Sequence, residues 1–312
     1  MINEAAITLK QLRALVAITE SGSLTAAAET LGLTPPAVST QLKLLEENLG
    51  TRLMMRGNDG KTSLTSAGQE VLRSTRQVEA ALTSCYEKVK SIRQGKYGYL
   101  GIGVVSTGKY FAPHLVAAFQ RENPDIQVGL RIGNREEIIA LVMDGAVDVA
   151  IMGRPPRAPV ATAEILGPHP HIFIAPRGHR LADGCDVSPD ALLAETFLVR
   201  ERGSGTRILM ERLLDRLGEG RPYQTLEMGT NETIKQAVMA GLGIALISGH
   251  TVASELADGR LVQLKVNGVP IVRQWFLMHR RDMPLTAVTE KFRRFIVEQK
   301  GRFLPDLPAP DA

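Results

Sequence analysis

Residues 23–56 constrain the fold of this chain more than any other stretch. They form two short amphipathic segments separated by a tight turn, and the second segment opens with Thr34, Pro35 and Pro36. Thr34 is favoured at a helix N-cap, and Pro35 suits the first helical position because its missing N–H is not needed there. Gly32 stands where the first helix needs a left-handed residue to end. The pattern predicts a helix-turn-helix, whose second helix fits the major groove of DNA.

Each predicted helix has one apolar side. Ser23 is expected to cap the first helix, and Leu33 is expected to be buried in the turn. The apolar side of the hairpin comprises Ala26, Ala27, Leu31, Val38, Leu42, Leu45 and Leu49. The candidates for DNA contact are Ser23, Thr34, Pro35, Pro36, Ser39, Thr40 and Lys43. An ordinary helical hairpin inside a larger core would show the same periodicity, so the DNA interpretation needs further support.

A β-hairpin is predicted directly after the second helix. Two short strand-like segments flank the glycine-containing turn at 57–60, which is typical of a wing beside a recognition helix. Arg52, Arg56 and Lys61 cluster there and suit contact with phosphates or the minor groove. Residues 1–66 carry six basic and six acidic side chains. The placement of the basic residues, rather than an excess of them, must therefore attract DNA.

A heptad pattern follows the hairpin. Apolar or small residues recur at alternating steps of four and three, at Leu64, Gly68, Val71, Thr75, Val78, Leu82, Cys85, Val89 and Ile92. This spacing predicts a long helix that pairs with a second copy of the chain, with Cys85 buried as a small apolar residue. A homodimer would present two recognition helices to half-sites separated by about one turn of DNA, or a multiple of it.

From Tyr97 onward, strand-like and helix-like segments alternate. Predicted strands lie near 99–106, 126–133, 147–153, 171–176, 223–229, 242–248 and 275–280, and predicted helices near 109–123, 135–145, 188–194, 231–241 and 285–299. In the segment 197–218, the glycine-rich loop at 202–207 is expected to open a further helix. The alternation predicts βαβ units around a mostly parallel sheet, hence an α/β fold. His169 and His171 flank Pro170 and are expected at a strand edge. The tail from Leu304 is expected to be disordered.

Polar loops at the strand-to-helix corners of this region are expected to meet in a cleft between two lobes. Helix N-termini and paired arginines both favour a negatively charged ligand, such as a phosphate ester or a carboxylate. The candidate effector-binding residues are Ser106, Thr107, Lys109, Asn134, Arg135, Arg202, Gly203, Ser204, Thr206, Arg207, Thr230 and Asn231.

Several other classes of protein are disfavoured. The two cysteines, Cys85 and Cys185, are far apart, and the histidines show no metal-ligand spacing, so we expect no metal, no cofactor and a reducing cytoplasm. Ser204 lies in Gly-Ser-Gly rather than in a nucleophile elbow, and no carboxylate pair stands out, so catalysis is not expected. No apolar run reaches membrane-spanning length, and the N-terminus lacks a secretory pattern.

The N-terminal third resembles LysR-type transcriptional regulators. The similarity lies in AAAETLGLTPPAVSTQLKLLEENLG, RLMMR and LTSAG, which end at Gly68. The resemblance implies phosphate-type contacts for Ser23, Thr34, Ser39 and Arg56. Pro35 and Thr40 depart from the polar or basic residues that many members carry there. The helix at 67–95 corresponds to the dimerising linker of that family.

The remainder also resembles the family, whose effector domain has a two-lobed fold like that of periplasmic binding proteins. VVSTGKYFAPHLVAAFQRENP, LRIGNREEIIALV, RGSGTR and NETIKQAVMAGLGIALIS are similar to the subgroup that controls carbon-fixation operons. The resemblance implies a winged helix-turn-helix at 1–66, the linker at 67–95 and an effector domain at 96–312. Lobe I would span about 96–167 and 270–305, and lobe II about 168–269.

This resemblance implies a cytoplasmic activator of carbon-fixation genes that binds double-stranded promoter DNA as a homodimer or homotetramer and contacts RNA polymerase. Its effector would be a phosphorylated sugar or NADPH. Two alternatives stay open: a LysR-type regulator of amino-acid or aromatic metabolism, and a bilobed solute-binding protein. The DNA-binding module and the absence of a signal peptide argue against the second.

Overall fold

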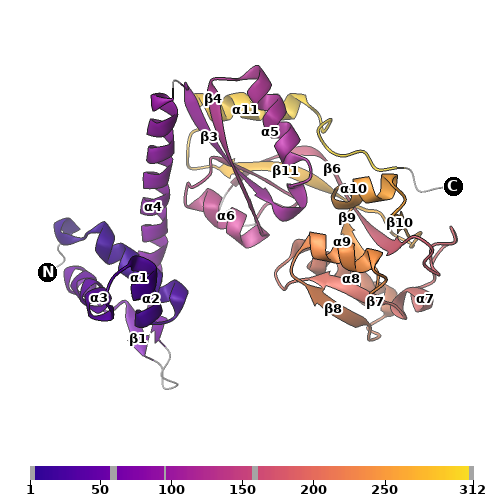
Figure 1. The fold of residues 1–312 in the computed structure, drawn as a ribbon, viewed down its shortest axis with the longest axis horizontal. Coiled ribbons are helices and arrows are strands. Elements are labelled where there is room, and N and C mark those ends of the chain that lie inside the picture. The colour runs from indigo at the N-terminus through magenta and orange to yellow at the C-terminus, as the bar shows by residue number, and fades with distance from the viewer. Residues whose placement is uncertain (1–3, 57–61, 95, 157–160, 309–312) are drawn as a thin grey trace. The chain divides into compact units, whose positions relative to one another are not determined.

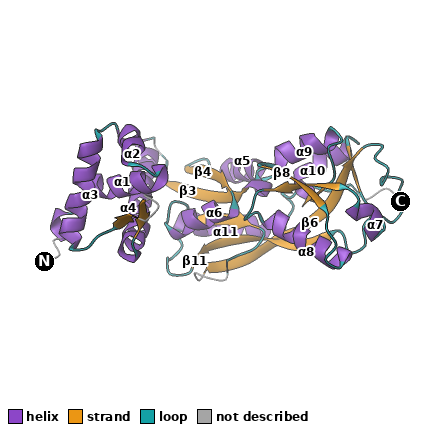
Figure 2. Cartoon of the chain, turned by 90° about the horizontal axis from the view of Figure 1, so that it is seen from below, coloured by secondary structure: helices purple, strands orange, loops and turns teal. Residues whose placement is uncertain are grey.

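The computed structural model describes residues 4–56, 62–94, 96–156 and 161–308. The chain divides into two compact units, residues 1–85 and 86–312. In Figure 2, helices dominate the N-terminal unit, whereas strands flanked by helices make up the C-terminal unit. No helix in the described ranges is both long enough and apolar enough to cross a membrane.

The N-terminal unit is a small helical bundle with a two-stranded hairpin. Its elements are η1 (Glu4–Ala6), α1 (Leu9–Ser21), α2 (Leu24–Leu31), α3 (Pro35–Leu49), β1 (Met54–Arg56), β2 (Thr62–Leu64) and most of the long α4 (Ser66–Arg93), which continues past the boundary at residue 85. Its core contains the buried side chains of Ala14, Leu15, Ala17, Ile18, Ala27, Ala28, Val38, Leu45 and Leu53. Helix α1, which starts in a capping box at Thr8, supplies four of these residues.

The predicted hairpin of helices is confirmed as α2 and α3. The Ser23 hydroxyl accepts a hydrogen bond from the backbone N–H of Ala26, and Gly32 ends α2 with φ of 63°. Thr34 is the N-cap of α3, but its side chain makes no capping hydrogen bond. The prediction that Leu33 is buried is wrong, because this side chain is 47% exposed.

Helix α4 begins later than the heptad pattern predicts. Leu64 belongs to strand β2, and the Thr65 hydroxyl accepts a hydrogen bond from the Gly68 N–H at 2.9 Å, which fixes the first turn. Gly68 approaches the Leu53 carbonyl so closely that no Cβ would fit between them. Leu64 thus continues the apolar periodicity of the helix without being part of it.

The C-terminal unit has an α/β fold, as predicted. Its strands are β3 (Gly98–Val105), β4 (Ile126–Gly133), β5 (Val149–Met152), β6 (Ala161–Pro176), β7 (Thr196–Arg200), β8 (Gln224–Met228), β9 (Ala245–Ser248), β10 (Leu261–Gln263) and β11 (Ile271–Arg280). Its helices are η2 (Ser106–Gly108), α5 (Ala112–Glu122), α6 (Arg135–Met143), α7 (Pro189–Leu193), α8 (Gly205–Gly218), α9 (Asn231–Met239), α10 (Gly249–Ala257) and α11 (Ala287–Glu298).

The main sheet is mixed rather than mostly parallel, which corrects the sequence prediction. Its strands run in the order β10-β6-β11-β5-β3-β4, with β9 also pairing with β6. The pairs β3–β4 and β3–β5 are parallel, whereas β11 and β6 pair antiparallel with each other and with their other partners. Strands β7 and β8 form a separate parallel pair.

Strands β6 and β11 connect two lobes, as Figure 1 shows. One hydrophobic core lies among β3, α5 and α11, and it includes Phe119, Trp275 and Phe292. Separate cores surround β7, α8 and α9. The register of β11 shifts between Trp275 and Phe276, opposite Gly167. On β6, this irregularity falls at Leu166, which packs in the first core, whereas Phe173, farther along the strand, packs in another.

The C-terminal segment packs against the protein as far as Leu307, so the prediction of disorder from Leu304 is wrong over 304–307. Phe303 lies 5.5 Å from Phe111 between ring centroids. A Cβ on Gly249 would lie 2.5 Å from Leu307, so the segment also contacts the start of α10. Residues 309–312 lie outside the described ranges.

Candidate functional site

Helix α3 presents a polar face to solvent and an apolar face to the core. Val38 and Leu45 are fully buried. The predicted DNA-contact residues on the helix are all exposed, namely Pro35, Pro36, Ser39, Thr40 and Lys43, as are Ser23 and Thr34. The Thr40 hydroxyl donates to the Pro36 carbonyl at 2.9 Å, whereas no partner is recorded for the Thr34 hydroxyl among the described residues. Thr34 therefore keeps its donor available for a phosphate oxygen.

The predicted wing is present as the antiparallel pair β1–β2. Arg52 is exposed just before β1. The turn at 57–60, Lys61 and the Arg56 side chain lie outside the described atoms. Glu46, on α3, accepts hydrogen bonds from the Leu53 and Met54 N–H groups at 2.7 and 3.3 Å. This carboxylate fixes the wing beside the recognition helix, a role that the sequence pattern did not reveal.

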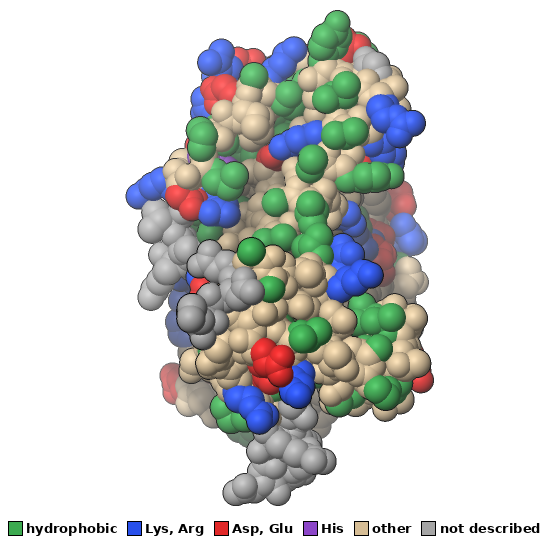
Figure 3. All heavy atoms as spheres, turned by 90° about the vertical axis from the view of Figure 1, so that its left-hand side faces the viewer, with side chains coloured by type: hydrophobic (Ala, Val, Ile, Leu, Met, Phe, Trp, Pro, Cys, Tyr) green, Lys and Arg blue, Asp and Glu red, His purple; other side chains and the backbone are tan. Residues whose placement is uncertain are grey.

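Charged side chains of both signs are scattered over the surface. In Figure 3, Lys/Arg and Asp/Glu side chains lie among larger uncharged and hydrophobic areas on the face that is drawn. Lys43 lies 3.6 Å from Glu47 in an exposed pair, which solvent screens strongly. This agrees with the balanced charge of the sequence: individual basic groups, rather than a broad basic field, would contact the DNA backbone.

The heptad positions of α4, which form its apolar seam, change from buried to exposed along the helix. Gly68 and Thr75 are buried within the N-terminal unit. Farther along, the apolar positions are open to solvent in the single chain: Val78 is 42% exposed, Leu82 44%, Val89 50% and Ile92 68%. Cys85 is also exposed, so its predicted burial is not found within one chain. The stretch 78–92 thus presents apolar side chains that nothing in the described chain covers.

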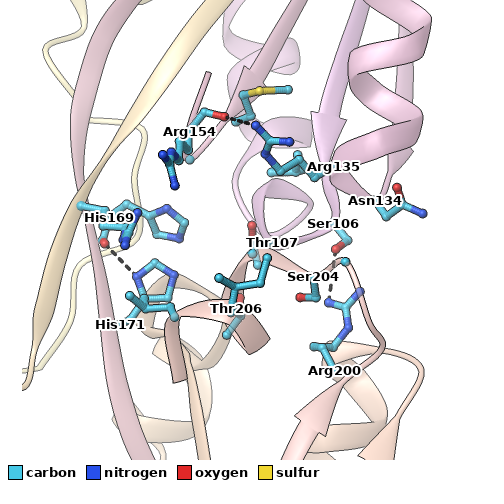
Figure 4. A pocket seen from close by; sticks show the side chains of 18 of the residues that line it. Ser106, Thr107, Asn134, Arg135, Arg154, His169, His171, Arg200, Ser204 and Thr206 are labelled. Carbon is cyan, nitrogen blue, oxygen red and sulfur yellow. Dashed lines mark hydrogen bonds between the residues drawn. The ribbon is translucent and has the colours of Figure 1, made fainter. Parts of the chain in front are cut away.

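A cavity of about 420 Å³ lies in the C-terminal unit between the two lobes. It is lined by seven of the twelve predicted effector residues, namely Ser106, Thr107, Asn134, Arg135, Gly203, Ser204 and Thr206. Figure 4 shows Ser106, Ser204 and Arg200 gathered on one side and His169 with His171 on the other. Asn134 caps α6 in a capping box with Glu137, and Ser204 precedes α8, so two helix N-termini meet at the cavity.

The other five predicted residues do not line this cavity. Arg207 donates to Glu211 at 2.8 Å and to Glu227 at 2.5 Å, so its guanidinium is held elsewhere. Lys109 lies 3.3 Å from Glu232. Thr230 caps α9, Asn231 accepts a hydrogen bond from Arg200 behind the cavity wall, and Arg202 is exposed. A position near a helix start therefore does not by itself predict which residues line the cavity.

Sequence reasoning missed the strongest electrostatic feature of the cavity. Arg154, Arg200, Arg212 and Arg273 line it together with Arg135. Burial and the nearby charges of Arg154 and Arg212 lower the pKa of Arg273. No carboxylate among the described residues forms an ion pair with Arg135, Arg154, Arg212 or Arg273. Such like-charged groups strongly favour an anionic ligand.

Two buried histidines form one wall of the cavity. His169 and His171 are each 4% exposed and lie inside β6, between β11 and β9, rather than at the predicted strand edge. His169 stacks on Trp275 with 3.9 Å between ring centroids. Burial lowers the pKa of His169 well below its usual value and that of His171 to about 4. Both rings are therefore neutral near pH 7 and leave the arginines as the positively charged groups of the cavity.

Comparison with known proteins identifies both units. Residues 9–69 match the model of the bacterial regulatory helix-turn-helix protein of the lysR family, and residues 93–301 match the LysR substrate binding domain. The chain is 49% identical over 310 residues to the HTH-type transcriptional regulator CbbR of Cereibacter sphaeroides, covering 99% of this chain and 100% of that protein.

Two further similarities are informative. The chain is 39% identical over 296 residues to the RuBisCO operon transcriptional regulator of Allochromatium vinosum, covering 95% and 97% of the two chains. The solved regulatory domain of Synechocystis PCC6803 CcmR in complex with 2-PG is 33% identical, covers 65% of this chain and 97% of its own, and has a TM-score of 0.60. With both family models matched in their expected order, the chain belongs to the LysR family and is a DNA-binding transcriptional regulator rather than an enzyme.

Proposed function

We propose that this regulator controls carbon-fixation operons in response to a small anion bound in the arginine-lined cavity. The cavity carries the proposal: among its described lining residues are five arginines and two glutamates. The similarity to regulators named CbbR and to the RuBisCO operon regulator supports the choice of target genes. CcmR, whose regulatory domain was solved with 2-PG, supports a small effector at an equivalent domain. We infer a phosphorylated sugar or NADPH as the effector and activation as the outcome.

We assign the contacts with double-stranded promoter DNA to α3, its N-cap and the wing. Ser23, Thr34, Ser39, Lys43, Arg52, Arg56 and Lys61 would contact phosphates, and Pro35, Pro36 and Thr40 would lie against base edges in the major groove. The exposed apolar seam of α4 would pair two chains, and dimers would associate into tetramers. This activity takes place where bacterial promoter DNA and RNA polymerase are, in the cytoplasm.

The proposed domain division follows these roles: residues 1–66 bind DNA, 67–95 dimerise and 96–312 bind the effector. An anion would contact Arg135 from one lobe and, from the other, the N-terminus of α8, where Ser204 is the N-cap. It would thereby favour one of two lobe arrangements over the other. In an oligomer, such a shift alters the spacing of the recognition helices and the bend of the DNA.

A thermal-shift screen of the full chain tests this function. Sugar phosphates and NADPH should raise the melting temperature, because a ligand that binds only the folded state stabilises it by mass action. Amino acids and aromatic acids serve as the comparison set, since they represent the effectors of the alternative pathways. If only amino acids or aromatic acids raise the melting temperature, the regulator would be assigned to another pathway and the carbon-fixation assignment would be wrong.

A further inference from the structure

One arginine of the cavity already holds an anion supplied by the chain itself. Arg200, the last residue of β7, is only 7% exposed. Its Nε donates to Glu201 Oε2 at 2.6 Å, and its Nη2 donates to Glu201 Oε1 at 2.8 Å. This Nε–Nη2 edge is the edge with which arginine recognises a carboxylate or a phosphate through two parallel hydrogen bonds. Glu201 therefore fills the position that an anionic ligand would take on Arg200.

The two partners are held very differently. The Nη1 group of Arg200 donates to Asn231 Oδ1 at 2.7 Å and to Ser106 Oγ at 3.4 Å, so the guanidinium has supports from both lobes. The Glu201 side chain is 33% exposed, and Arg200 is its sole recorded side-chain partner in the described ranges. It also begins the turn that contains Gly203, whose φ is 88°. Glu201 is thus the partner that can leave, while Arg200 stays in place.

We propose that Glu201 is an internal competitor of the effector and sets the selectivity of the cavity. This inference rests on the anion-binding function proposed above. An incoming anion must replace both oxygens of Glu201 on the Nε–Nη2 edge of Arg200. A phosphate or carboxylate can do so, because two of its oxygens accept the two hydrogen bonds together. An ion such as chloride, which makes a single contact, cannot displace Glu201. The apparent affinity is lowered by the fraction of molecules in which Glu201 occupies the site.

The cavity offers a matched control for this idea. Glu136 lines the same cavity and, like Glu201, adds one negative charge to it. No ion pair or side-chain hydrogen bond of Glu136 is recorded among the described residues. Neutralising Glu136 therefore reports the general effect of charge, and any larger effect at Glu201 reports the loss of competition.

The test uses inorganic phosphate as the probe and the full-length chain, with affinity measured by calorimetry in chloride buffers of constant ionic strength. Glu201→Gln should tighten phosphate binding by about tenfold if the pair is closed about nine-tenths of the time. Glu136→Gln should change the affinity by less than about threefold. Glu201→Asp keeps the charge but is one methylene too short to chelate Arg200, so it should also tighten binding.

Four outcomes are informative. Tighter binding by both Glu201 variants, beyond the effect of Glu136→Gln, supports competition. Weaker phosphate binding by Glu201→Gln would instead mean that Glu201 positions Arg200 for the ligand. Equal effects of the two Gln variants would mean that Glu201 acts only through its charge. Either result overturns the inference but leaves the proposed anion site in place. Failure of phosphate to bind any variant would overturn the proposed function together with it.

Discussion

The arginines of the effector-binding unit belong to two groups that look alike in the sequence. Arg207 stands in a glycine-rich loop that opens a helix, but its guanidinium is paired with Glu211 and Glu227 outside the cavity. Arg273 stands in a strand with no motif around it, yet it lines the cavity without an acidic partner among the described residues. The difference arises from tertiary neighbours, which decide whether a guanidinium is neutralised or left to attract a ligand.

Substituting Arg273 with methionine tests the cavity at this scale. Arg273→Met should lower the affinity for an anionic effector at least about tenfold, because a charged contact in a partly buried site is lost. The free energy of unfolding should not decrease, since the change removes repulsion from Arg154 and Arg212. Calorimetry and urea unfolding measure the two effects. Arg207→Met is the matched comparison and should leave effector affinity within about twofold; a loss equal to that of Arg273→Met would place the site elsewhere.

Arg56 belongs to the DNA-binding unit and is tested by salt dependence. Arg56→Ala should weaken binding to specific and random duplexes alike and reduce the slope of log affinity against log salt by about one, because one phosphate contact is lost. Fluorescence anisotropy over a salt series measures both. An unchanged slope would remove Arg56 from the phosphate contacts.

At the scale of elements, the sequence predicts a helix correctly where local residues determine its start and end. The cap at Ser23 and the glycine at Gly32 act as predicted, and the helix predicted from residue 135 begins at Arg135. Leu64 shows the limit of periodicity, because an apolar residue in the heptad register can belong to the preceding strand. The antiparallel pairing of β6 with β11 lay beyond the sequence, since it joins strands far apart in the chain whose partners are set by the global fold. For the same reason, the cavity residues Arg154 and Arg273 could not be assigned.

The exposed seam of α4 predicts how the chain associates. Leu82→Lys should convert the proposed dimer to a monomer, because a charge would be buried in an apolar helix pair. The fold of each chain should be retained, since Leu82 is 44% exposed in the single chain. Analytical ultracentrifugation gives the mass and circular dichroism the helix content. Thr83→Lys, at an exposed position next to Leu82 but outside the seam, is the control and should stay dimeric; a dimer with both variants would place the interface elsewhere.

At the scale of the whole molecule, buried histidines link stability to pH. Burial lowers the pKa of His171 and His250 to about 4 from the usual 6.5. The folded chain keeps both rings neutral between these values, whereas the unfolded chain binds protons there. Their contribution to stability is therefore complete above pH 6.5 and is lost as the pH falls toward 4.

This linkage predicts a measurable loss of stability in mild acid. The free energy of unfolding should fall by about 2 kcal/mol for each of these two histidines between pH 7 and pH 5. His250→Gln, which keeps an acceptor for the Trp275 indole N–H, should make the total drop smaller by about 2 kcal/mol, the share of this one histidine. Urea unfolding at the two pH values measures the effect, and an equal drop in the variant would show that His250 does not titrate as the structure implies.

The central claim is that an anion in the arginine-lined cavity controls how this protein holds promoter DNA. The most direct measurement is the bend and affinity of a carbon-fixation promoter fragment, with and without the stabilising ligand found by thermal shift. We expect the ligand to change the bend for the unsubstituted protein, whereas Arg273→Met should bind the same fragment equally well and not respond. A ligand response that survives in Arg273→Met, or a protein that does not distinguish this fragment from random duplex, would contradict it.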